Sequence, residues 1–207
     1  MMFVDGENLT IRLQALASAT SLQLKEGPYW KRDVFIWLPG LSPRAPWGEL
    51  EAWASVGPAS TRSHYYTSVG GDEHTLEAVR TSLWTMGFDP YVFKRDASTK
   101  RSKGVDIALA KDMLGHAFHG HYDLALLVAG DADYVPLVEE VKRLGKVVHV
   151  LFPEAYGLGD KLRLASDDFT DLTSEFTQRW KAAARVTPSP EDSVTVTGST
   201  SPKASKT

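Results

Sequence analysis

One stretch, residues 124–140, limits the folds open to this chain of 207 residues. It begins with six consecutive apolar residues and continues through Gly130, Asp131 and Asp133 into a helical pattern. An unbroken apolar run of this length is typical of a strand buried on both faces of a parallel α/β sheet. Ligands bind at the carboxyl ends of the strands in such sheets, and unpaired charges are costly to bury. The two aspartates therefore lie where a site with a cationic group is expected.

Strand-like and helix-like segments alternate along the rest of the chain. We expect strands at residues 2–4, 34–38, 62–69, 91–93, 124–129 and 146–152. We expect helices at residues 9–19, 47–56, 73–86, 105–115 and 134–144, with one or two more within residues 161–180. This alternation predicts a three-layer α/β/α sandwich with a mainly parallel central sheet and helices on both faces.

The length suits one α/β domain. We expect that domain at residues 1–185, with a core at 1–152 that carries the motifs and a C-terminal helical extension at 153–185. Residues 186–207 are rich in Pro, Ser and Thr and nearly free of large apolar side chains. This composition predicts a disordered tail.

Composition excludes several classes of function. The chain has no cysteine, which excludes disulfides, cysteine-ligated zinc and thiol nucleophiles and fits a reducing cytoplasm. The net charge of -3 means that nucleic-acid binding has to rest on a local basic patch. No apolar run approaches the ~20 residues of a membrane span, and the first residues lack the basic region of a signal peptide. We therefore expect a cytoplasmic protein without membrane association.

Carboxylates follow two of the expected strands and begin one expected helix. Asp5 follows the first strand, Asp131 and Asp133 follow the central one, and Asp106 lies in the first turn of the helix at residues 105–115. If the two strands are neighbours, their ends lie about 5 Å apart. Carboxylates this close repel one another unless a cation or a proton intervenes. Oxygen ligands without cysteine favour Mg²⁺ or Mn²⁺, which suits metal-assisted hydrolysis of phosphodiesters.

Three segments in this order resemble the NYN domain, in particular its bacterial LabA/DUF88 branch within the PIN-like nuclease superfamily. They read FVDGEN at residues 3–8, KGVDIALAKD at 103–112 and AGDADYVPL at 129–137. The resemblance covers residues 1–152 and implies a PIN-like fold and a ribonuclease that depends on Mg²⁺ or Mn²⁺. By position, it implies catalytic, metal-binding roles for four acids and polar support from two further residues. These are Asp5, Asp106, Asp131 and Asp133, and then Asn8 and Asp112.

The chain departs from the family pattern at two positions. The family usually has Ser or Thr where this chain has Ala129, so a hydroxyl near the metal is lost. It usually has Phe where this chain has Tyr134. Asp112 follows the pattern, but it lies about 240° around a helix from Asp106, so both cannot face one metal from one regular helix. We therefore assign Asp112 a supporting role.

Each acid also has an ordinary structural role that the sequence leaves open. Aspartate is a common turn and helix-cap residue, so Asp5 could be a turn or cap residue. Asp133 could be the N-cap of the helix at residues 134–144. Asp106 lies where the helix dipole favours any acid.

A basic segment immediately precedes Asp106. Its five cationic residues are Lys94, Arg95, Lys100, Arg101 and Lys103. Such charge is often only solvated, but phosphate contacts supply most sequence-independent affinity for nucleic acids. We predict that this segment holds the RNA backbone, with Lys103 as the strongest candidate.

Three histidines, His116, His119 and His121, look like a metal cluster. We expect them at a helix end on the edge of the sheet opposite the acids, where a structural role is favoured.

Together these features predict a ribonuclease that hydrolyses RNA phosphodiesters, with single-stranded RNA favoured and self-association left open. The alternative is a non-catalytic module that binds RNA, a nucleotide or a protein partner through the same acidic cleft. A haloacid-dehalogenase-like phosphatase would need a second aspartate two positions after the first, where this chain has Glu7.

Overall fold

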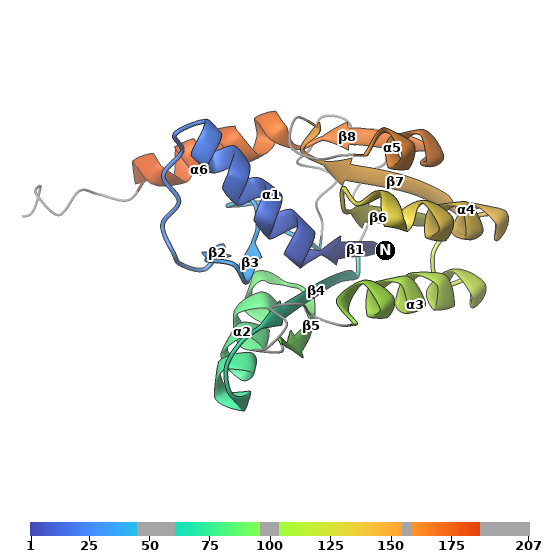
Figure 1. Ribbon diagram of the computed structural model, residues 1–207, viewed down its shortest axis with the longest axis horizontal. Helices are drawn as coiled ribbons and strands as arrows, with labels where there is room; N and C mark the ends of the chain where they lie inside the picture. The colour runs from blue at the N-terminus through green and yellow to red at the C-terminus, as the bar shows by residue number, and fades with distance from the viewer. Residues whose placement is uncertain (45–60, 96–103, 155–158, 187–207) are drawn as a thin grey trace, which may run out of the picture.

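The structure is a computed structural model that describes residues 1–44, 61–95, 104–154 and 159–186 (Figure 1). The strands of its main sheet are β1 (Met2–Asp5), β4 (Ser63–Val69), β5 (Asp89–Lys94), β6 (Leu124–Val128), β7 (Val147–Phe152) and β8 (Asp168–Asp171). The α-helices are α1 (Gly6–Ala19), α2 (Glu73–Met86), α3 (Val105–Phe118), α4 (Val135–Arg143), α5 (Asp160–Ala165) and α6 (Thr173–Val186). A short 3₁₀ helix, η2 (Ala132–Tyr134), leads into α4.

The main sheet has the order β5-β4-β1-β6-β7-β8, and every neighbouring pair is parallel. The chain moves outward from β1 to β4 and β5, and then returns to the other side of β1 to build β6, β7 and β8. The pairing of Val4 with Val128 places the carboxyl ends of β1 and β6 side by side. This reversal of strand order is the topological switch point at which open α/β sheets bind ligands.

Helices cover both faces of the sheet, as the sequence predicts. One apolar cluster includes side chains of α1, α2 and α6, and the other includes side chains of α3, α4 and α5. Figure 1 shows α3 and α4 side by side, in agreement with their mutual contacts. Along β6, Leu126 and Val128 enter the first cluster while Ala125 and Leu127 enter the second. The apolar run is therefore a strand covered on both faces, and the predicted α/β/α sandwich is confirmed.

The buried strand predicted at residues 34–38 is shorter than predicted and lies outside the main sheet. These residues contain β3 (Phe35–Ile36), which pairs antiparallel with β2 (Trp30–Lys31) in a separate two-stranded sheet. The Tyr65 hydroxyl lies 3.1 Å from both the amide nitrogen and the carbonyl oxygen of Ile36. An apolar run indicates that a segment is buried but not which sheet it joins. This segment is buried against α1 and Tyr65 outside the main sheet.

The helical prediction for residues 161–180 omitted a strand. Between α5 and α6 the chain forms β8, which pairs parallel with β7 and adds a sixth strand. Its sequence, DFTD, is short and polar, and its side chains are exposed or half-buried, so it carries no apolar pattern. Helix boundaries also differ: α1 begins at Gly6 instead of residue 9, α3 continues through Gly115 to Phe118, and α6 ends at Val186 instead of residue 180.

Some predictions fall outside the described residues. They are the helix at 47–56, the tail from residue 187 onward, and the basic residues Lys100, Arg101 and Lys103.

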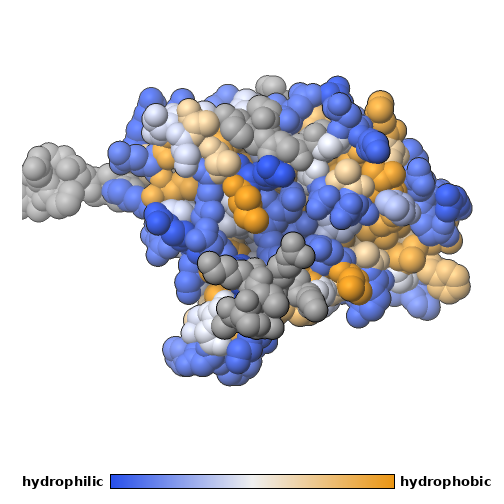
Figure 2. Space-filling model, viewed as in Figure 1, coloured by the Kyte–Doolittle hydropathy of each residue, from blue (hydrophilic) through white to orange (hydrophobic). Residues whose placement is uncertain are grey.

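Hydrophilic residues predominate on the face drawn in Figure 2, with hydrophobic residues in separate groups. Among the described helices, none is long and apolar enough to cross a membrane.

Candidate active site

Asp5 ends β1 and starts α1 at the switch point. Its Oδ1 accepts a 3.0 Å hydrogen bond from the amide of Asn8, so it is the N-cap of α1, the ordinary role that the sequence left open. The side chain is also drawn into the candidate site, because its Oδ2 accepts a 3.0 Å hydrogen bond from the Tyr134 hydroxyl. Burial raises the pKa of Asp5 to about 7, and repulsion from Asp106 and Glu7 acts in the same direction.

Gly6, beside Asp5, lies where the chain passes close against β4. A Cβ at this position would clash with the ring of Tyr65 and would lie 2.7 Å from the carbonyl oxygen of Tyr66. The backbone of the first motif therefore passes too close to β4 for any side chain.

Asp106 reaches the same point from α3. It lies in the first turn of the helix, after Gly104, whose φ of 121° is open mainly to glycine. The Tyr134 hydroxyl lies 3.3 Å from Asp106 Oδ1, so one hydroxyl contacts both Asp5 and Asp106. Burial raises the pKa of Asp106, and the hydrogen bond from Tyr134 lowers it. Repulsion from Glu7, Asp131 and Asp133 adds to the rise.

Asp131 and Asp133 follow β6 at the solvent-exposed mouth of this site. Asp131 is the N-cap of η2, and its Oδ1 accepts a 3.0 Å hydrogen bond from the amide of Asp133. The alternative in which Asp133 caps the following helix is therefore wrong, because Asp133 already lies inside η2. Both carboxylates are exposed, and both are near enough to raise the pKa of Asp106.

Asn8 holds the loop that carries the aspartate pair. Its Oδ1 accepts a 3.1 Å hydrogen bond from the amide of Gly130. The side chain of Ala129, immediately before this glycine, is fully buried in the cluster beneath α3 and α4. The position at which the family usually has a hydroxyl is therefore surrounded by apolar side chains in this protein.

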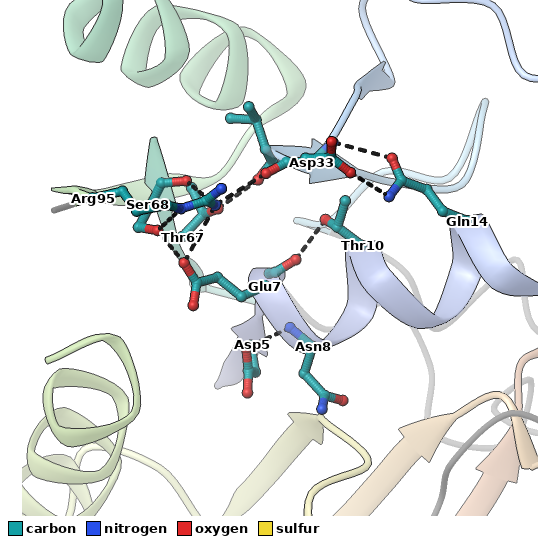
Figure 3. Close-up of polar contacts among 11 residues, drawn as sticks. Asp5, Glu7, Asn8, Thr10, Gln14, Asp33, Thr67, Ser68 and Arg95 are labelled. Atoms are coloured by element: carbon teal, nitrogen blue, oxygen red, sulfur yellow. Dashed lines mark hydrogen bonds and ion pairs between the residues drawn. The ribbon is translucent and has the colours of Figure 1, made fainter. Parts of the chain in front are cut away.

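Sequence analysis missed two residues of the site, Glu7 and Tyr134. Figure 3 shows Glu7 reaching toward Ser68 and Arg95 from the start of α1, where its carboxylate accepts a hydrogen bond from Ser68. Its charge acts on both Asp5 and Asp106. Glu7 could have been predicted as a site residue from its place inside the FVDGEN motif. Tyr134 could have been predicted from its departure from the family's usual phenylalanine.

Arg95 is the described part of the basic segment that lies nearest these acids. Its guanidinium lies 3.6 Å from Glu7 Oε1, and it donates hydrogen bonds of 3.0 Å to the hydroxyl and the carbonyl oxygen of Ser68. It also donates to the carbonyl oxygen of Asp33 at 3.1 Å. Arg95 therefore ties the end of β5 to neighbouring backbone, whereas Lys94 is exposed.

Asp112 lies apart from this group, as its position on the helix predicts. Its Oδ2 accepts a 3.1 Å hydrogen bond from the Tyr66 hydroxyl, and its Oδ1 lies 3.3 Å from Lys111 Nζ. The histidines lie at the far end of α3, where the Nδ1 atoms of His116 and His121 are 2.8 Å apart.

The chemistry of these side chains fits a hard divalent cation. Asp5, Asp106, Asp131 and Asp133 offer only oxygen, and the chain has no cysteine. Over the described ranges, however, no group of three or more His, Cys, Asp and Glu side chains is arranged as a finished metal site. Hydrogen bonds within the protein occupy these oxygens instead: Asp5 and Asp106 share the Tyr134 hydroxyl, and Asp131 accepts from the amide of Asp133.

Comparison with known proteins is consistent with this arrangement. The family model of the NYN domain matches residues 1–173, most of the chain. The chain belongs to the NYN family. This family is part of the PIN-like nuclease superfamily, whose members generally use divalent metal ions, and NYN nucleases typically act on RNA.

The crystal structure of a protein of unknown function from Vibrio parahaemolyticus resembles this NYN domain. The two are 19% identical with a TM-score of 0.53, over 84% of this chain and 93% of the other. At this identity the likeness concerns the fold alone. No curated protein matches the chain.

Proposed function

We propose that this NYN protein is a ribonuclease that depends on Mg²⁺ or Mn²⁺ and hydrolyses phosphodiester bonds of single-stranded RNA. Asp5, Asp106, Asp131 and Asp133 would hold the cation at the switch point. When bound, the cation would activate water and stabilise the leaving oxygen.

The observation that carries this proposal is the meeting of Asp5 and Asp106 at one hydroxyl. The two acids come from different motifs and different elements, and repulsion from Asp106 raises the pKa of Asp5. Packing alone gives no reason to gather acids at this point, because buried like charges destabilise a fold. A cation that binds them would relieve that repulsion.

The chain's own residues have distinct tasks in this proposal. Asn8 fixes the loop that presents Asp131, and Gly6 lets the first motif pass close against β4 beside Asp5. The exposure of Asp131 and Asp133 leaves room for a phosphate group to approach from solvent. Lys94 would attract the RNA backbone through its charge.

One observation favours a second candidate, a non-catalytic module that binds RNA or a protein partner at the same place. The Tyr134 hydroxyl already gives Asp5 and Asp106 a hydrogen-bonding group, so these acids have a partner without a cation. Metal binding and turnover therefore have to be measured separately.

The test is cleavage of a labelled single-stranded RNA in Mn²⁺, in Mg²⁺ and in EDTA. Wild type is compared with Asp131→Asn and with a control variant, Asp123→Asn. Asp123 is an exposed aspartate at the other end of β6, paired with Lys146. We expect metal-dependent cleavage by wild type and by the control, and a loss of at least 100-fold in Asp131→Asn, on the order of that seen when one charge-stabilising group is removed from an active site.

Cleavage that survives in Asp131→Asn would contradict the assignment of the site. If wild type binds RNA in a metal-dependent manner without cutting it, the non-catalytic module is the correct function.

A further inference from the structure

Tyr134 contacts two of the site acids through a single group. Its hydroxyl lies 3.0 Å from Asp5 Oδ2 and 3.3 Å from Asp106 Oδ1. The residue is 4% exposed, and its ring belongs to the apolar cluster beneath α3 and α4. The hydroxyl is therefore held in place by packing of the ring.

A tyrosine hydroxyl is a limited partner for two carboxylates. It carries one hydrogen, so it can donate to only one of the two acids at a time. The other acid faces an oxygen with its lone pairs. The pair of acids is thus held together by a group that satisfies only one of them.

The oxygen atoms that Tyr134 contacts are also those that a cation would need. The other oxygen of Asp5, Oδ1, accepts the hydrogen bond that caps α1. Oδ2 is therefore the oxygen of Asp5 directed into the site, and it is the one that the Tyr134 hydroxyl contacts. On Asp106 the hydroxyl contacts Oδ1, which is the second carboxylate oxygen that this one group reaches.

We propose that Tyr134 guards the cation position, holding Asp5 and Asp106 together without metal and competing with the metal for their oxygens. This inference rests on the proposed metal-dependent function. It assigns Tyr134 a positioning role that sets the affinity for the cation. A phenylalanine at this position would keep the packing of the ring and remove the competitor.

The experiment compares the Mn²⁺ affinity of wild type, Tyr134→Phe and Tyr122→Phe by isothermal titration calorimetry without RNA. Tyr122 is the matched control, because its hydroxyl also makes a buried hydrogen bond, 2.8 Å to the carbonyl oxygen of Met113, at the amino end of β6. We expect Tyr134→Phe to bind Mn²⁺ about tenfold more tightly than wild type, the effect of removing one competing charge-assisted hydrogen bond. The control should bind as wild type does. Circular dichroism verifies that all three proteins are folded.

Two results would overturn the inference while leaving the proposed function in place. Equal Mn²⁺ affinity in wild type and Tyr134→Phe would mean that the hydroxyl does not compete. Weaker binding by Tyr134→Phe would mean that the hydroxyl helps to hold the metal. In either case, metal-dependent RNA cleavage by wild type would still support the nuclease.

Failure of the proposed function gives a different pattern. If neither wild type nor Tyr134→Phe binds Mn²⁺, the metal-dependent function and the inference are both wrong. If only Tyr134→Phe binds Mn²⁺, the guarding role is supported, and the wild-type protein is a domain whose metal site is closed by its own tyrosine.

Discussion

The side chain of Asn8 and the backbone of Gly130 join the first and third motifs of the chain. These residues are 122 positions apart, and the Gly130 amide donates a 3.1 Å hydrogen bond to Asn8 Oδ1. Asn8 lies in the first turn of α1, and Gly130 lies one residue before Asp131. The position of Asp131, in the third motif, therefore depends on a side chain of the first motif.

We expect Asn8→Ala to lower RNA cleavage at least tenfold and to lower the free energy of unfolding by about 1–2 kcal/mol. The partly buried amide of Gly130 would lose its acceptor, and the loop with Asp131 would lose its anchor. Ser18→Ala is the control, since Ser18 lies on the same helix and its hydroxyl donates to the carbonyl oxygen of Gln14 at an exposed position. Cleavage rates and urea denaturation measure both effects. Unchanged cleavage by Asn8→Ala would mean that the loop is fixed by other contacts.

Gly6 and Gly115 should respond in opposite directions to the same substitution. A Cβ on Gly6 would meet Tyr65 and the backbone of Tyr66, so Gly6→Ala should destabilise the fold by about 3 kcal/mol or more. A Cβ on Gly115 has nothing within 4 Å, and this residue lies inside α3. Gly115→Ala should therefore stabilise by about 0.5–1 kcal/mol through helix propensity. Chemical denaturation of both variants provides the comparison, and a neutral Gly6→Ala would refute the close approach.

Lys94 and Arg95 are adjacent in sequence but should differ in their effect on RNA binding. Lys94 is exposed, so Lys94→Ala should leave the stability of the fold unchanged. The slope of log RNA affinity against log salt concentration should become shallower by about 0.7, the value for one lost phosphate contact with a single strand. Arg95→Ala should instead reduce stability by about 1–3 kcal/mol, because the guanidinium makes hydrogen bonds to Ser68 and Asp33. RNA titrations at several salt concentrations, paired with denaturation curves, separate the two roles. An unaltered slope in Lys94→Ala would remove Lys94 from the RNA interface.

His64 should make the fold sensitive to acid. It is buried between the rings of Phe3 and His116, and within the described part of the chain neither ring nitrogen has a hydrogen-bond partner. Burial lowers the pKa of His64 to about 4, although Asp89 acts in the opposite direction. The unfolded chain takes up this proton near pH 6.5. The stability linked to neutral His64 is therefore present above pH 6.5 and is lost as the pH falls toward 4.

The size of this loss is at most about 3 kcal/mol, from a difference of roughly 2.5 pKa units. His64→Phe keeps an aromatic ring between the same neighbours and should remove that part of the pH dependence. His74→Phe, at an exposed position on α2, is the control and should retain it. Thermal unfolding from pH 7 to pH 4 in EDTA measures the difference, and a parallel decline in all three proteins would contradict the assignment to His64.

The sequence by itself determined the sandwich and the central strand, and it named the acids that the proposal places at the site. The run at residues 124–129 predicts a strand covered on both faces, because successive side chains of a strand point to opposite faces of the sheet and here all of them are apolar. The helix at residues 73–86 was predicted at its observed boundaries, since an N-cap aspartate and a following Gly87 mark its ends. Both signals lie within one segment of the chain, so they can be read from the sequence without knowledge of its neighbours in space.

The tertiary structure alone decided which elements are neighbours and which groups share a partner. β8 joins the sheet by pairing with β7 although its own residues are polar, and β3 stays outside the sheet although its residues are apolar. The same holds at the site, where a hydroxyl from Tyr134 lies between Asp5 and Asp106. These relationships depend on contacts between distant segments, which composition and periodicity do not encode, and only the folded chain brings them together.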